Sequence, residues 1–260
     1  MRASARETSA PLRCGAADRR PPETGTIHER GTVRIVSKHL EREIDILKKR
    51  LLGLSAKVED NIHKAVRSLA ERDSALADEV IASDDLDIDQ TEVAIEEECL
   101  KVLALHQPVA GDLRFIVAIL KINGDLERMG DLAVNIAERA AFLASRERPE
   151  IPLDLTLMAE KTKEMVRKSL DALMNRDSKL AREVLASDDD VDAMNRDMYA
   201  RIQEAIRRRP EQLESLIHLL SCSRHLERIA DHATNVAEDV VYMVEGVIVR
   251  HHAEDYRAET

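Results

Sequence analysis

Two hexapeptides in the two halves of the chain carry the same pair of acids. The sequence reads LERMGD at 126–131 and LERIAD at 226–231. Each contains a Glu and an Asp four residues apart, which stand one turn above the other on a helix: Glu127 with Asp131, and Glu227 with Asp231. Like charges at this spacing cost a helix about a few tenths of a kcal/mol. A bound cation would offset that cost in both copies.

Further acids precede the helical turn before each hexapeptide. Residues equally distant from the turn between two antiparallel helices lie side by side, so these acids are expected to face the hexapeptide acids. Four carboxylates would then meet at one level of each half. The two predicted sets of metal ligands are Asp85, Asp89, Glu127 and Asp131 around the turn at Pro108, and Asp188, Asp192, Glu227 and Asp231 around the turn at Pro210.

Carboxylate arrays of this kind suit iron, manganese, magnesium or zinc, with carboxylates bridging the ions and water completing the coordination shell. Without a cation, neighbouring like charges would raise some of the pKa values within each array. The opposing interpretation is a solvated helix face whose acids pair with Arg128, Arg139 and Arg228. His225 and His232 lie seven residues apart on another side of the second helix, and we expect them at the surface.

An internal duplication explains why the acids recur. The segment RDSALADEVIASD at 72–84 returns as RDSKLAREVLASD at 176–188. Each copy is predicted to contain a long helix that ends near Arg72 or Arg176, and then a short helix capped by Asp73 or Asp177. Two further antiparallel helices follow, at about 87–105 and 112–142 in the first copy and about 190–207 and 212–244 in the second. The prediction is an all-α chain of two tandem, similar three-helix bundles.

Prolines and glycines suggest the boundaries of these bundles. Residues 1–33 have no helical apolar period and are predicted to form a disordered tail, with natural translation starting near Val33 as an alternative. The first bundle is predicted over 34–146, the second over 147–246, and a C-terminal tail over 247–260. The stretch RERPEIPLD at 146–154 is the predicted linker.

Composition agrees with this organisation. Hydrophobic residues make up 44% of the 260 residues and aromatic residues only 2%, as expected for helices packed through aliphatic side chains. The formal charge of −11 argues against binding nucleic acid through a basic face. Three cysteines without a CxxC pair suit a reducing cytoplasm, and Cys99 and Cys222 are expected in the core. No apolar run reaches the roughly 20 residues that span a bilayer.

These motifs together resemble the PhoU family, the accessory regulators of bacterial phosphate-specific transport. The resemblance runs from about Ser37 to Gly246 and depends on QPVAGDLR, ERMGD and the second copy LERIADHATNVAEDVVYMVEG. The family's E(D)xxxD metal signature maps onto Glu127 with Asp131 and Glu227 with Asp231, where members bind multinuclear iron or zinc clusters. This chain has Ala230 where the common pattern has Gly, but both acids of that copy are intact.

The resemblance implies two similar three-helix bundles and a regulatory role. PhoU-like proteins dampen phosphate signalling when phosphate is plentiful. They contact the ATPase subunit of the phosphate ABC transporter (PstB-like) and a phosphate-sensing histidine kinase (PhoR-like). They are cytoplasmic, peripheral to the membrane, and often homodimers or larger, so we expect no enzymatic activity, nucleic-acid partner or transmembrane segment.

The residues leave two other classes open. One is a carboxylate-bridged metal enzyme of the ferritin-like type, although that class uses Glu-x-x-His ligand pairs in a bundle core, and no His here has a Glu three residues before it. The other is a helical adaptor without metal. The sequence shows no P-loop or other Gly-rich phosphate cradle.

Overall fold

The computed structural model describes residues 29–149 and 155–249, without the side chains of 29–37 and 83–87. Six α-helices and one 3-10 turn lie within these ranges, and no β-strand does. In chain order they are α1 (Glu29–Glu71), α2 (Ser74–His106), α3 (Ala110–Ala144), α4 (Leu155–Asn175), α5 (Ser178–Arg208), η1 (Pro210–Gln212) and α6 (Leu213–Glu245). The predicted all-α fold of two similar three-helix bundles, α1–α3 and α4–α6, is confirmed.

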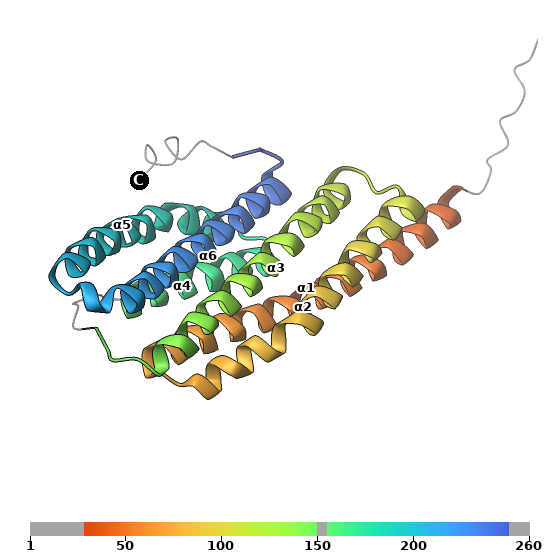
Figure 1. Ribbon diagram of the computed structural model, residues 1–260. Helices are drawn as coiled ribbons and strands as arrows, with labels where there is room; N and C mark the ends of the chain where they lie inside the picture. Colours follow the sequence, from red (N-terminus) through yellow and green to blue (C-terminus); the bar gives the residue numbers. More distant parts are fainter. Residues whose placement is uncertain (1–28, 150–154, 250–260) are drawn as a thin grey trace, which may run out of the picture.

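The two bundles lie side by side, with α3 and α6 running next to each other between the α1–α2 pair and the α4–α5 pair (Figure 1). The apolar stripe of α3 faces inward, and its members are completely buried: Ile119, Ile122, Leu126, Met129, Ala133 and Ile136. Each Leu or Ile buried in this way stabilises the fold by about 1.5–3 kcal/mol. One hydrophobic cluster contains residues of both bundles, so the two repeats share a core.

The first and fourth helices end in the same way. Arg72 and Arg176 adopt left-handed backbone conformations, with φ of 59° and 51°. The following amides reach back into the finished helix: Asp73 N–H donates to the Ser68 carbonyl (3.1 Å) and Asp177 N–H to the Ala172 carbonyl (2.9 Å). This pattern is the Schellman motif, here built around arginine rather than glycine.

Asp73 and Asp177 cap the next helices, as predicted. Asp73 accepts from the Leu76 amide at 3.1 Å, and Asp177 accepts from the amides of Lys179 and Leu180 at 2.9 and 3.1 Å. The prediction of a separate short helix after each cap is wrong, because α2 and α5 each continue without a break to the proline turn. Neither helix contains Gly or Pro, so the acids that interrupt the apolar period do not interrupt the backbone.

The ends of the chain meet the predicted boundaries only in part. Helix α1 begins at Glu29, inside the stretch 1–33 predicted as a tail, while residues 1–28 lie outside the described residues. The centre of the linker and residues 250–260 also lie outside them. Cys99 and Cys222 are free thiols in the core, as expected, and burial raises the pKa of each to about 12. No helix in the described part of the chain is both long and apolar enough to cross a membrane.

Replacing Asp177 tests whether it stabilises the protein as the N-cap of α5. Asp177→Ala removes the acceptor of two otherwise unpaired amides, so we expect the free energy of unfolding to fall by about 1 kcal/mol, measured by urea denaturation. Asp171→Ala, which removes an exposed acid near the C-terminal end of α4, is the matched control and should change stability by less than about 0.5 kcal/mol. Equal losses in the two variants would contradict the capping role.

Candidate metal centres

The second repeat brings its four predicted carboxylates together. Asp188 lies on α5 and is half-buried. Burial is the largest cause that raises its pKa to about 6, and the charges of Asp231, Asp192, Asp189 and Glu227 add to it. Those neighbours come from both α5 and α6. The antiparallel pairing inferred from distance to the turn is therefore confirmed here, whereas a metal-binding role for these acids stays a prediction.

The acids on α6 experience the same environment. Burial and then Asp231 and Asp192 raise the pKa of Glu227. Part of Asp231 faces solvent, yet packing around its carboxylate, followed by the charge of Asp192, raises its pKa as well. Arg228 acts against both shifts but does not outweigh them. Asp192 does pair with an arginine, because Arg196 lies 3.1 Å from its carboxylate. The solvated-face interpretation therefore describes part of this cluster, while the pKa values of Glu227 and Asp231 stay raised.

The first repeat contains a related cluster on α2 and α3. Burial raises the pKa of Glu127, followed by the charges of Asp131, Asp89 and Glu92. The predicted proximity of Asp89 to Glu127 is therefore confirmed. Arg128 lowers the pKa of Glu127 only as the weakest cause, and Arg139 pairs with Glu138 instead. The side chain of Asp85 lies outside the described residues.

Glu92 is a further carboxylate in the first cluster and was not predicted from the sequence. Burial and then Glu96 and Asp89 raise the pKa of Glu92, and its backbone carbonyl accepts a hydrogen bond from the buried Asn123 amide at 2.9 Å. Its position could have predicted this, because Glu92 lies three residues after Asp89 and therefore one turn further along the same face of α2.

The second repeat has neutral side chains at the positions that correspond to Glu92 and Asn123. Asn195 and Ser223 occupy the positions of Glu92 and Asn123, and the Ser223 hydroxyl donates to the Asn195 amide oxygen at 2.7 Å. The two acidic clusters are therefore chemically different. The first cluster has the additional carboxylate of Glu92. At the same position the second cluster has Asn195, which is hydrogen-bonded to Ser223.

The donor set fits a hard or borderline cation, because carboxylate oxygens dominate both clusters and several are held close together despite raised pKa values. Among the described residues, however, no three His, Cys, Asp or Glu side chains already converge as a metal-binding group. The carboxylates are neighbours rather than a closed coordination shell. Binding an ion would require side-chain rotation toward it, driven by relief of their mutual repulsion.

The two histidines are not at the surface, contrary to expectation. His232 is buried, and its Nδ1 lies 2.8 Å from Asp125 Oδ1 on α3; the Asn235 amide also donates to Asp125 Oδ1, at 3.2 Å. His225 is half-buried, and burial followed by the charges of nearby arginines lowers its pKa to about 4. Both lie where α6 packs against the first repeat, a neighbour that a helical wheel of α6 alone does not include.

The raised pKa of Asp188 makes stability depend on pH in the metal-free protein. The folded-state pKa of about 6 exceeds the ordinary 3.8. Folding therefore favours the protonated acid, and its stabilisation is complete below about pH 4 and lost as pH rises through about 6. With chelator at pH 7.5, Asp188→Asn should stabilise by on the order of 1 kcal/mol, raising Tm by about 2–4 °C.

The same comparison at pH 4 should show little difference in Tm between the two proteins, by differential scanning calorimetry. Asp171→Asn is the control and should shift Tm at neither pH. A lower Tm for Asp188→Asn at pH 7.5 would contradict the proposed electrostatic strain.

The architecture and these clusters define a class: tandem helical bundles with a shared core and acidic side chains on paired helices. The family model of the PhoU domain matches residues 51–140 and 155–240, one match in each repeat. The chain therefore belongs to the PhoU family.

Curated relatives agree with this assignment. The chain is 42% identical over 212 residues to the "Phosphate-specific transport system accessory protein PhoU homolog" of Aquifex aeolicus, covering 82% of this chain and 96% of the relative. It is 36% identical to the Pseudomonas aeruginosa homolog of the same name, over 83% of this chain and 89% of the relative.

Solved structures share the fold. The crystal structure of PhoU from Pseudomonas aeruginosa matches with a TM-score of 0.77 at 36% identity, covering 80% of this chain and 99% of that one. The phosphate transport system regulatory protein PhoU from Streptococcus pneumoniae matches with a TM-score of 0.72 at 31% identity, covering 81% and 99%.

Proposed function

We propose that this chain is a negative regulator of phosphate signalling and phosphate uptake, acting as a metal-binding helical adaptor. Its partners would be the ATPase subunit of the phosphate ABC transporter and a phosphate-sensing histidine kinase. The observation that carries the metal-binding part is the cluster of Asp188, Asp192, Glu227 and Asp231 on facing helices, three of which have raised pKa values. The relatives' name, accessory protein of the phosphate-specific transport system, supports the regulatory part.

The proposed metal is iron or zinc, held as a multinuclear cluster in each repeat. A cation between α5 and α6 would neutralise the repulsion across that helix pair and fix its geometry, and the same holds for α2 and α3. Metal loading would then set the shape of the outer helices, so that the clusters serve as structural or sensory elements. This role needs no catalysis, in keeping with relatives that are named accessory proteins.

Exposed apolar side chains at the two proline turns support an adaptor role. Leu105, Val109 and Leu113 are between 41% and 75% exposed around the α2–α3 turn. Leu213 and Ile217 are 44% and 51% exposed after the α5–α6 turn. Such residues are suited to contacts with partners or with a second copy of the chain. We place the protein in the cytoplasm, as a homodimer held at the inner face of the membrane through its partners.

Complementation tests the regulatory role. In a host lacking its own PhoU and grown in phosphate-rich medium, the natural chain should restore repression of alkaline phosphatase. Output that stays high, with the chain expressed and folded, would contradict the proposal. Purified protein should also contain iron or zinc by elemental analysis, and replacement of the metal ligands should remove it.

The variant Glu127→Ala, Asp131→Ala, Glu227→Ala and Asp231→Ala should lose both the metal and the repression while keeping its helical circular dichroism. A matched control removes four exposed acids outside the clusters: Asp78, Glu97, Asp171 and Glu211, each to Ala. The control should repress like the natural chain. Full repression by the cluster variant would show that these carboxylates are not required.

A further inference from the structure

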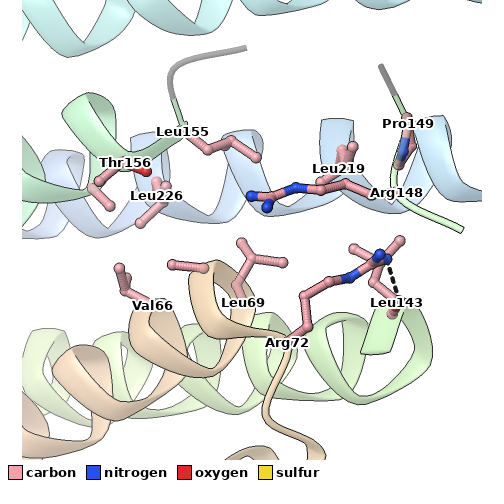
Figure 2. Close-up of a pocket in the computed structure, with 12 residues that line it drawn as sticks. Val66, Leu69, Arg72, Leu143, Arg148, Pro149, Leu155, Thr156, Leu219 and Leu226 are labelled. Atoms are coloured by element: carbon pink, nitrogen blue, oxygen red, sulfur yellow. Dashed lines mark hydrogen bonds between the residues drawn. The ribbon is translucent and has the colours of Figure 1, made fainter. Parts of the chain in front are cut away.

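A cavity lies where the first repeat meets the second, and none of the clustered carboxylates lines it. It has a volume of about 130 Å³ and is lined by the end of α1, the end of α3 and parts of α4 and α6. The apolar part of its wall includes Val66, Leu69, Leu155, Leu219 and Leu226 (Figure 2). A cavity of roughly 150 Å³ lined by Leu, Ile and Phe binds benzene in another protein, and this space is close to that size.

Two arginines and the threonine Thr156 supply polar side chains to this cavity. Arg148 extends into the space between Leu155 and Leu69, and Arg72 donates to the Leu143 carbonyl at the edge (Figure 2). No carboxylate is among the residues that line it. Burial, followed by the charge of Arg148, lowers the pKa of Arg72. Two guanidinium groups beside apolar walls would be relieved of their repulsion by an anion.

The corresponding arginine of the second repeat lies beside an aromatic ring. There Arg176, the counterpart of Arg72, has its guanidinium 5.0 Å from the ring centre of buried Phe115 on α3. Alignment of LERMGD with LERIAD puts Ser215 of α6 at the position of Phe115. Ser215 lies one turn before the lining residue Leu219 and carries no ring to match the one beside Arg176.

We propose that this cavity binds a small amphiphilic anion, an aromatic ring carrying one carboxylate or phosphate group. The ring occupies the apolar space in the place of the missing Phe, and the oxyanion lies between Arg72 and Arg148. A guanidinium over the ring adds a cation–π contact like that of Arg176 with Phe115. Because the walls come from both repeats, the ligand would bridge them. The site is independent of the proposed metal clusters.

Calorimetric titration of the full chain with benzoate and with phenyl phosphate tests the site. We expect at least one of them to bind, and comparison of the two shows which oxyanion is preferred. Benzyl alcohol, which lacks the charge, and inorganic phosphate, which lacks the ring, should both bind at least tenfold more weakly. Absence of binding by both ring anions at millimolar concentration would overturn the proposal, as would equal binding of inorganic phosphate.

Two variants locate the binding. Arg148→Ala should weaken affinity about tenfold or more, because a hydrogen bond to a charged group is lost. Arg146→Ala is the control: Arg146 is a nearby exposed arginine that pairs with Glu214 at 3.4 Å and does not line the cavity. Ser215→Phe restores the ring found at position 115 and should abolish binding.

Equal affinities for the two arginine variants would overturn the assignment of Arg148. Unchanged affinity in a folded Ser215→Phe protein would overturn the assignment of the cavity. If that protein does not fold, the arginine pair still decides the outcome.

Discussion

The packing of α3 against α6 is the contact on which the rest of the structure depends. Each of these helices is the final helix of its repeat, and each contributes its apolar stripe to a core that contains residues of both bundles. A three-helix unit has little interior of its own, and joining two of them increases the fraction of surface that is buried. The acids lie on the flanks of α3 and α6 because the apolar stripe already occupies the inward faces.

This contact also fixes the polar groups between the repeats. Lys121 donates to the buried Asp239 at 2.7 Å, and His232 meets Asp125 at 2.8 Å, each pair joining α3 to α6. Losing a hydrogen bond to a buried polar group is costly, so these two contacts favour a single arrangement of the two helices. The repeats are held in register by apolar burial and by these specific pairs.

Duplication gave two similar scaffolds whose side chains have since diverged. Glu92 and Asn123 in the first repeat correspond to Asn195 and Ser223 in the second, which changes one level of the acidic cluster from charged to neutral. Phe115 corresponds to Ser215, so the aromatic ring that lies beside Arg176 is missing from the second copy of this position. A common backbone therefore supports two different electrostatic environments and two different packings.

The sequence by itself determined the helical class, the duplication, the caps at Asp73 and Asp177 and the pairing of acids around each proline turn. These features depend on spacing along one helix or across one short turn, where distance in sequence fixes distance in space. The continuity of α2 and α5 was misjudged, because a run of acids breaks the apolar period without breaking the backbone.

Only the tertiary structure decided the features that depend on contacts between the repeats. His232 is buried because α3 covers it, and no pattern within α6 contains that information. The cavity beside Arg72 and Arg148 likewise exists only where helices from both repeats meet. The shift in the pKa of Asp188 had a predictable direction from its neighbours, but its size depends on how far packing excludes water from the carboxylate.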